Sequence, residues 1–465
     1  MIKLLLSEIA DLVGGKLVGE DVEVYGSVET DSRLVAGGSL FVAKPGEVTD
    51  GHNFLDSAKN LGAVGAIVER LVPDIDIPQV VVSDSVSALG LLAKAVLAKV
   101  RETGKLKVIG ITGSNGKTST KNMLRTVLAE FGPTIAPIES YNNEVGAPIS
   151  ILKIDGETQF LVAELGAGGV GSIAYLAEIT KPDIGVMLKV GLAHAGAFGG
   201  IEVTTKIKAE LALALGAENV FIYNADDGEV SAMTALTPAK PVSFGTNRTS
   251  AIRFDNVNLS IAGTSADIHY PDGEVARLTL HILGEHQLMN ATAAIAVAEE
   301  LGLPRSKVRH QLEQLQLAER WRMQLTNRKD GISIINDAYN ASPDSMKAAL
   351  QTLAHLGKAG RRTIAVLGEM AELGEFSKAA HDEIGRLVVR YNIDHLVVIG
   401  PGAKLIHMGA MFEGSWDGES VYFESSSEAL TYIRGMLVSG DIVLVKSSKS
   451  ANLRHLGDDL LEVHS

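Results

Sequence analysis

The sequence predicts an α/β protein built from three domains. Its 465 residues correspond to about three domains of roughly 150 residues each. Apolar runs of strand length alternate with segments of helical periodicity, which is typical of mostly parallel sheets covered by helices on both faces. We therefore expect an N-terminal α/β domain (1–103), a central, mostly parallel α/β domain (104–318) and a C-terminal Rossmann-like α/β domain (319–465).

Composition and charge exclude several classes of protein. Lys and Arg total 42 and Asp and Glu total 56, so the net charge is −14. Because general binding of nucleic acid needs a basic face, we expect no nucleic-acid partner. The absence of cysteine excludes thiolate nucleophiles, cysteine-ligated zinc and disulfides. No run reaches the ~18 uncharged apolar residues of a membrane span, and MIKLLLSEIADL lacks the apolar core of a signal peptide, so we expect a cytoplasmic protein.

The first predicted domain mixes short strands, turns and helices. GGSLFVAKPGE predicts a turn, a strand and a second turn, and GAVGAIVER and PQVVVSD predict two further strands. In LGLLAKAVLAKVRETG two lysines interrupt an apolar run at helical spacing, which predicts an amphipathic helix at the end of this domain.

The central domain opens with the strongest motif of the chain, GITGSNGKTST. The apolar run KVIGIT precedes a glycine turn, and a helical segment follows it, which is the setting of a phosphate-binding loop. Backbone N–H groups there form an anion cradle, Lys117 can reach the β- and γ-phosphates, and the Thr118 hydroxyl can hold Mg²⁺. The strict G-x-x-x-x-G-K-[ST] spacing is not met, because Ile111 stands where the first glycine would fall.

Further polar residues follow the next strands of this domain. Glu164 ends the strand QFLVAEL, where a carboxylate lies beside the phosphate loop and can hold Mg²⁺ directly or through water. His194 comes after the strand DIGVMLKV, and both a structural role and contact with a metal or phosphate are open for it. Lys206 and Lys208 begin a helix, and taken alone they are typical of a solvated helix face.

After residue 240 the sequence first takes on the alternation of antiparallel strands and then crosses into the third domain. IRFDNVNLS, SADIHYP and ARLTLHIL alternate with period two and predict antiparallel strands, followed by a long Ala-rich helix beginning near Asn290. RWRMQL marks the crossing into the third domain. Its Arg320 and Arg322 suit either phosphate oxygens or salt bridges between domains.

The third domain repeats the strand–helix alternation without a glycine fingerprint at its first strand. ISIINDAY, RTIAVLGE, HLVVIG, SVYFES and DIVLVK predict its strands. Asp337, Tyr339 and Asn340 are expected in a loop after the first of them, with Ser342-Pro343 leading into a helix. Polar groups gathered at a strand end indicate a site.

Taken in order, these motifs resemble one family, the ATP-dependent Mur ligases of peptidoglycan synthesis. The resemblance covers nearly the whole chain and is carried by TDSR (30–33), LFVAKPGEVTDGHNF, TGSNGKTST, YNNEVGAP, AELGAG, VGLAHAGAFG, GEHQLMNATAA, RWRM, NDAYNASPDSM, LGEMAELGEFS and VLVKSS. NDAYNASPDSM and LGEMAELGE point to the member that joins D-alanyl-D-alanine to UDP-N-acetylmuramoyl-tripeptide. The resemblance implies an ADP-forming carboxylate–amine ligase that works through an acyl phosphate, with ATP, two Mg²⁺ ions and these two substrates.

The resemblance also implies roles for particular residues. The uridine nucleotide would contact Thr30, Ser32 and Arg33, and the ATP phosphates would contact Thr112, Gly113, Ser114, Asn115, Gly116, Lys117, Thr118 and Ser119. One Mg²⁺ would bind Thr118 and Glu164, and the second would bind His194 and Lys208, a lysine that carries a carbamate in family members. Other nucleotide contacts would be Asn290 to the adenine, Arg322 to the γ-phosphate, and Asp337 and Asn340 from the third domain. Asn143 would lie along the muramoyl channel, and Lys446 and Ser448 near the incoming dipeptide. Catalysis would fall to Lys117, His194, Lys208 and Arg322.

Other functions remain as alternatives at this point. One is a sibling ligase that adds a diamino acid, and another is a folyl-polyglutamate synthetase, against which TDSR argues because the folate enzyme lacks a uridine site. A different class is a P-loop NTPase switch, in which hydrolysis drives a change of partner binding. We expect a monomer.

Overall fold

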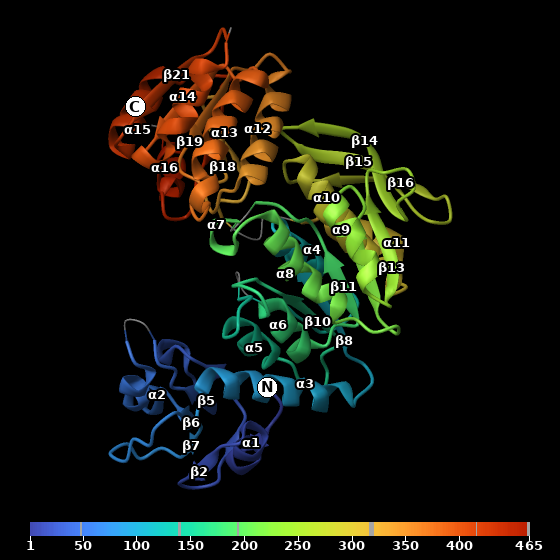
Figure 1. Cartoon of the computed structure of the whole chain (residues 1–465), viewed down its shortest axis with the longest axis vertical. Coiled ribbons are helices and arrows are strands. Elements are labelled where there is room, and N and C mark those ends of the chain that lie inside the picture. Colours follow the sequence, from blue (N-terminus) through green and yellow to red (C-terminus); the bar gives the residue numbers. More distant parts are fainter. Residues whose placement is uncertain (47–48, 138–140, 193–194, 316–319, 415, 463–465) are drawn as a thin grey trace.

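The computed structural model describes residues 1–46, 49–137, 141–192, 195–315, 320–414 and 416–462. The N-terminal and C-terminal parts lie at opposite ends of the long axis, with the central part between them (Figure 1). A two-stranded and a five-stranded sheet form the first part, a nine-stranded sheet the second and a six-stranded sheet the third. The predicted class, an α/β protein with three domains, is confirmed, while the exact domain boundaries stay a prediction.

The N-terminal part is built around the five-stranded sheet, of strand order β2-β7-β6-β5-β4. β4 to β7 are parallel and β2 is antiparallel to β7. Its elements are β1 (Leu4–Leu5), α1 (Leu6–Val13), β2 (Lys16–Val18), β3 (Glu23–Val24), β4 (Val28–Glu29), η1 (Ser32–Leu34), β5 (Ser39–Val42), η2 (Gly51–Phe54), α2 (Leu55–Asn60), β6 (Ala63–Val68), β7 (Gln79–Val81) and α3 (Ser85–Arg101).

α3 joins this part to the central part through a common apolar core. Its buried face, including Leu89, Leu92 and Val96, belongs to one cluster with Val108 of the next strand and Ile149 of a central helix. Because separation would expose this face to water, the first 103 residues are not packed as an independent body.

The central part contains the nine-stranded sheet, of order β16-β15-β14-β13-β12-β11-β8-β10-β9. In this order, β14, β13, β12, β11, β8, β10 and β9 are parallel to one another. β14, β15 and β16 form the predicted antiparallel meander at one edge. Its elements are β8 (Lys107–Thr112), α4 (Lys117–Ala129), β9 (Thr134–Ile135), α5 (Gly146–Ile151), β10 (Phe160–Glu164), α6 (Ser172–Thr180), β11 (Ile184–Met187), α7 (Ala195–Phe198), α8 (Ile201–Leu213), β12 (Val220–Asn224), α9 (Gly228–Ala232), η3 (Met233–Leu236), β13 (Lys240–Gly245), β14 (Ile252–Ser260), β15 (Gly263–His269), β16 (Val275–Leu280), α10 (Glu285–Glu300) and α11 (Arg305–Glu313).

Both faces of this sheet are buried, because successive residues of a strand point to opposite sides. Val186 of β11 packs in the cluster that contains α4, α10 and α11. The next residue, Met187, packs in the cluster that contains α6 and α8. The near-continuous apolar sequence of these strands follows from this two-sided cover.

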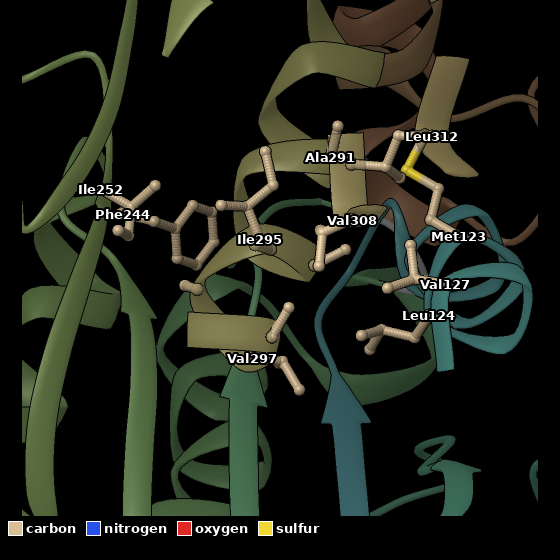
Figure 2. Packing of buried hydrophobic residues seen from close by; sticks show 14 of the residues in the cluster. Met123, Leu124, Val127, Phe244, Ile252, Ala291, Ile295, Val297, Val308 and Leu312 are labelled. Carbon is tan, nitrogen blue, oxygen red and sulfur yellow. The ribbon is translucent and has the colours of Figure 1, made fainter. Parts of the chain in front are cut away.

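The helix α10 occupies the centre of the larger cluster (Figure 2). Phe244 and Ile252, from the strands β13 and β14, lie on the side of the helix that carries Ile295 (Figure 2). Side chains of α4 and α11, among them Leu124 and Leu312, lie on its other side (Figure 2). The helix begins at Glu285, five residues before the expected start near Asn290, because Gly284 at its N-cap has a φ of 109° that ends the preceding extended segment.

The C-terminal part has a six-stranded sheet of order β17-β18-β22-β19-β20-β21, in which only β17 is antiparallel to its neighbour. Helices α12, α13 and α14 pack on one face and α15 and α16 on the other. Its elements are β17 (Gln324–Asn327), β18 (Ser333–Asn336), α12 (Pro343–Gly357), β19 (Thr363–Leu367), η4 (Gly374–Phe376), α13 (Ser377–Arg390), β20 (His395–Ile399), η5 (Pro401–Ala403), α14 (Lys404–Phe412), β21 (Glu419–Phe423), α15 (Ser426–Met436), β22 (Ile442–Lys446) and α16 (Leu453–Asp459). Among the described residues, no helix has both the length and the apolar character needed to cross a membrane.

Replacing Phe244 by alanine should destabilise the central part. The side chain is fully buried against α10, and removing a buried phenyl ring costs about 3–5 kcal/mol through lost transfer energy and the remaining cavity. Urea unfolding followed by circular dichroism measures the loss. Val275→Ala is the control, because that side chain is 53% exposed and its truncation should change stability by about 0.5 kcal/mol or less. Equal losses in the two variants would contradict the packing assigned to Phe244.

Candidate active site

A cavity of about 500 Å³ lies where the carboxyl ends of strands from the central and C-terminal parts face each other. Strands β8, β10 and β11 are adjacent and parallel, so their carboxyl ends share one edge of the sheet. The walls of the cavity are formed by Ser114–Ser119, Asn142, Glu164, Gly166, Ala167, Leu188, Lys189, Lys208, Asn224, His286, Gln287, Met289, Asn290, Arg322, Met323, Asp337, Tyr339, Asn340, Ser342, Asp344, Ser345, Ala348 and Lys446. A volume of this size suits a small ligand.

The loop between β8 and α4 forms the floor of the cavity. Gly116 is the N-cap of α4 with a φ of 88°, and a Cβ at this position would collide with Asn290 Oδ1. The position therefore needs glycine both for its backbone and for its close approach to α10. The start of α4 turns its backbone N–H groups toward the cavity, which is the arrangement that binds phosphate. Thr112 does not line the cavity, because its hydroxyl donates to the Leu165 carbonyl oxygen at 2.8 Å.

Lys117 stands at the start of α4, half-buried in the cavity. Its Nζ donates to the carbonyl oxygen of Gly113 at 2.6 Å. Burial lowers the pKa of Lys117, the negative charge of Glu164 opposes that shift, and the positive charge of Arg322 adds to it. A phosphate group brought between Lys117 and Arg322 would relieve this repulsion.

Glu164 is almost completely buried at the end of β10, as the sequence predicts. Its Oε1 accepts a hydrogen bond from Thr118 Oγ1 at 3.3 Å and one from Asn142 Nδ2 at 2.8 Å. Its Oε2 is buried, has no hydrogen-bond partner among the described residues, and lies 3.9 Å from the Nζ of the fully buried Lys121. A buried carboxylate with an unused oxygen beside a hydroxyl is a suitable ligand pair for Mg²⁺.

Asn142 and Lys121 were missed from the sequence. Asn142 lies in YNNEVGAP, where only its neighbour Asn143 was singled out, and Lys121 follows Lys117 by one turn of the same helix. Four-residue spacing places both lysines on one helix face, so this signal was present in the sequence.

The two lysines of α8 have opposite environments. Lys206 is exposed, whereas Lys208 is only 3% exposed and lines the cavity. Burial lowers the pKa of Lys208 well below its usual value, and the nearby positive charge of Lys117 lowers it further. The solvated position typical of an isolated lysine is therefore wrong for Lys208. Burial therefore favours the neutral amine over the ammonium ion at this position.

The predicted partner of Lys208, His194, lies outside the described residues. Within the described ranges, no group of three or more His, Asp or Glu side chains could hold a metal ion. The oxygen ligands present for a cation are those of Thr118 and Glu164.

The C-terminal part supplies the opposite wall. The guanidinium group of Arg322 lies over the Tyr339 ring at 4.1 Å from its centre. Asp337 accepts a hydrogen bond from the Met323 N–H at 2.9 Å and pairs with Lys446 at 2.6 Å. Lys446 also donates to the Asn340 carbonyl oxygen at 3.0 Å. Lys446 and Asp337, predicted to contact different substrates, are thus partners in one buried pair.

α10 contributes the side wall. Asn290 is buried, and its amide donates to Gln287 Oε1 at 3.1 Å. Burial lowers the pKa of the neighbouring His286, whose Nδ1 has no partner among the described residues. Neither Gln287 nor His286 was singled out from the sequence, although both belong to the GEHQLMN motif.

Several predicted site residues do not line this cavity. Thr30, Ser32 and Arg33 belong to the N-terminal part, and the Arg33 side chain, 86% exposed, is held by Asp31 at 2.5 Å. Asn143 accepts a hydrogen bond from the Gly146 N–H at 2.9 Å at the start of α5. The Ser448 N–H donates to the Glu369 carbonyl oxygen at 2.8 Å. The cavity therefore joins most of the residues predicted to contact ATP and the metal, together with Lys446, but not Thr112, Gly113 or the residues predicted to bind uridine.

Family models match three successive segments of the chain. They are described as Mur ligase family, catalytic domain (residues 24–97), Mur ligase middle domain (residues 111–298) and Mur ligase, glutamate ligase domain (residues 321–449).

Relatives match along almost the whole length. The UDP-N-acetylmuramoyl-tripeptide–D-alanyl-D-alanine ligase of Mycobacterium tuberculosis is 41% identical over 99% of this chain and 98% of its own, and that of Bacillus subtilis is 33% identical over 99% of each. Among solved structures, MurF from Acinetobacter baumannii superposes with a TM-score of 0.90 at 30% identity and 99% coverage of both chains. The MurF ligase of Thermotoga maritima in complex with ADP superposes with a TM-score of 0.81 at 27% identity, over 94% of this chain and 96% of that one. On these full-length matches, the chain belongs to the Mur ligase family.

Proposed function

We propose that this protein joins D-alanyl-D-alanine to UDP-N-acetylmuramoyl-tripeptide at the expense of ATP, as the names of its full-length relatives describe for those enzymes. The observation that carries the proposal is the meeting of two cationic groups, Lys117 and Arg322, from different domains in one cavity beside Glu164. We place the reaction in the cytoplasm and expect a monomer to carry it out.

The chemistry follows from the poor reactivity of a carboxylate. An oxygen of the terminal carboxylate attacks the γ-phosphorus of ATP, the bond to the β-γ bridging oxygen breaks, and an acyl phosphate and ADP form. The amine of D-alanyl-D-alanine then attacks the acyl carbon, phosphate leaves, and the amine loses a proton as the amide forms. Such a reaction depends on positioning and charge neutralisation more than on a protein nucleophile.

The residues of the cavity divide this work. Lys117, at the phosphate loop, balances charge on the β- and γ-phosphates, and Arg322 approaches the γ-phosphate from the C-terminal domain. Tyr339 holds the guanidinium by stacking beneath it. Asn290, Asp337 and Asn340 contact the remainder of the nucleotide. The apolar and backbone surfaces around them exclude water, which would otherwise hydrolyse the acyl phosphate.

Magnesium is the cation that fits the oxygen ligands present. Thr118 and Glu164 would hold one ion, and Asn142 would fix the orientation of the carboxylate through its hydrogen bond to Oε1. A bound Mg²⁺ would neutralise phosphate charge.

Lys208 would take part in a second Mg²⁺ site together with His194. A carbamate forms when a neutral amine adds carbon dioxide and loses a proton, and the lowered pKa of Lys208 favours the neutral amine. The product carries two oxygens and a negative charge, and it would replace a buried cation by an oxygen ligand.

The remaining predicted contacts concern the two other substrates. Thr30, Ser32 and Arg33 would bind the uridine nucleotide in the N-terminal domain, and Asn143 would lie along the path of the muramoyl peptide. Lys446 and Ser448 would lie near the dipeptide. For Arg33, substrate binding would have to compete with its ion pair to Asp31.

The release of ADP tests the proposed reaction directly. We expect rapid release only when UDP-N-acetylmuramoyl-tripeptide and D-alanyl-D-alanine are both present, with one pentapeptide product per ADP. Replacing the dipeptide by a diamino acid should stop turnover. ATP hydrolysis that ignores both substrates would favour an NTPase switch and reject the ligase.

Lys117→Ala should lower kcat by about 10²-fold or more, because one lost donor at the charge of a transition state is worth roughly 3 kcal/mol. The fold should be preserved, since among the described residues the side chain bonds to backbone oxygens of its own loop. Steady-state kinetics and circular dichroism check both expectations. Near-normal turnover in a folded variant would show that Lys117 does not act on the phosphates.

Lys208→Ala should abolish most activity, whereas Lys206→Ala, two residues away on the exposed side of α8, should remain active. The loss follows from the missing carbamate oxygens, and acetate or another small carboxylate should restore part of the rate by supplying them. Carbon-13 NMR of the wild type with labelled bicarbonate should show a carbamate signal that Lys208→Ala lacks. If the two variants are equally active and no signal appears, the carbamate proposal is wrong.

A further inference from the structure

The segment Lys189–Gly191, which follows β11, lies between the phosphate loop and the C-terminal domain. On one side it holds Ser114: the Ser114 N–H donates to the Lys189 carbonyl oxygen at 2.7 Å, and the Gly191 N–H donates to Ser114 Oγ at 2.9 Å. On the other side, Lys189 Nζ forms an ion pair of 2.7 Å with Asp344 Oδ1. The same three residues therefore touch the loop and the neighbouring domain.

Asp344 stands in the first turn of α12 and is seated closely on this segment. A Cβ at Gly191 would collide with Asp344 Oδ2, so the carboxylate occupies the space that a side chain at position 191 would fill. A second contact lies beside it, since the hydroxyl of Ser342, the N-cap of α12, donates to Asn115 Oδ1 of the phosphate loop at 3.1 Å. The N-terminus of α12 is thus docked at two points, on the Lys189–Gly191 segment and on the phosphate loop.

The residues just before α12 are those that face the nucleotide site. Tyr339 and Asn340 lie in the same loop as Ser342, and Tyr339 stacks under Arg322. The docking contacts therefore lie within a few residues of the side chain on which Arg322 stacks.

We propose that Lys189 and Asp344 form an electrostatic latch between the central and C-terminal domains, which sets the position of Arg322 over the phosphates of the bound nucleotide. Both are positioning residues. This inference rests on the proposed function for its kinetic consequences, but the latch itself concerns only the arrangement of the two domains.

Because the Lys189–Asp344 ion pair is partly exposed, we expect it to affect the placement of the domains more than the stability of the fold. The Lys189 and Asp344 side chains are 45% and 28% exposed, and half-exposed ion pairs contribute little to folding stability. The pair enters none of the apolar clusters, neither that of the central domain nor the C-terminal one, which also takes in Leu283 of the central domain. Its effect should therefore appear in domain placement and nucleotide kinetics rather than in the unfolding temperature.

Charge reversal provides the test. Lys189→Asp and Asp344→Lys should each raise the KM for ATP and lower kcat/KM by about tenfold, within the range of about 5–150-fold typical of coupling between sites. The double variant, which restores opposite charges in reversed order, should return to within about threefold of the wild type. Lys347→Asp is the matched control, because it makes the same charge change on an exposed position of α12 and should have no effect.

A distance measurement makes the test independent of activity. Since the chain has no cysteine, Arg248→Cys and Glu428→Cys introduce two unique label sites at exposed positions of the two domains. Double electron–electron resonance between spin labels at these two positions should show a longer or broader distance distribution in each single charge reversal. The double charge reversal should show the wild-type distribution.

The outcomes separate the two proposals. Unchanged distances and kinetics in both single reversals, or a double variant no better than the singles, would overturn the latch. An unaltered wild type that fails to couple ADP release to the two substrates would overturn the proposed function, while the distances would still decide the latch.

Discussion

The site depends on the parallel pairing of β8 with its two neighbours. Glu164 pairs with Ile111 and Met187 with Thr112, so the ends of β10 and β11 arrive level with the start of the phosphate loop. This register brings the loop, the Glu164 carboxylate and the Lys189–Gly191 segment to one edge of the sheet. A shift by one residue would turn each side chain to the opposite face, so the Glu164 side chain reaches the cavity only in this register. Ligand binding at this edge follows from the sheet itself.

The local charge of the cavity is opposite to that of the chain. The net charge is −14, yet Lys117 and Arg322 line one cavity, with Lys121 buried beside it, around the carboxylate of Glu164. Burial and the positive charge of Arg322 lower the pKa of Lys117, and the charge of Glu164 compensates this only in part. A polyphosphate ligand would supply further negative charge at this position.

Contacts between domains complete this arrangement. The floor of the cavity comes from the central domain and the opposite wall from the C-terminal domain, so a nucleotide bound there touches both. The Asp337–Lys446 pair fixes the wall internally, since it ties the end of β18 to the end of β22. The contacts of α12 with Asn115 and Lys189 fix it relative to the floor. The N-terminal domain joins the central one through the apolar packing of α3, and none of its described residues lines this cavity.

The sequence by itself determined the features that depend on neighbours along the chain. Apolar periodicity predicted the strands and helices, the glycine turn after KVIGIT predicted the loop before α4, and the positions of Glu164 and Asp337 at strand ends predicted a place at the edge of a sheet, where both line the cavity. The tertiary structure alone decided which side chains meet across long separations. Asn142 bonds to Glu164, Lys446 pairs with Asp337, and Lys189 pairs with Asp344, 155 residues away. The pattern of residue types along a short stretch of sequence does not predict such pairs, because they form only when distant strands and helices pack together. The same packing made Lys208 a buried amine while Lys206 stayed in solvent, although the two are alike in sequence.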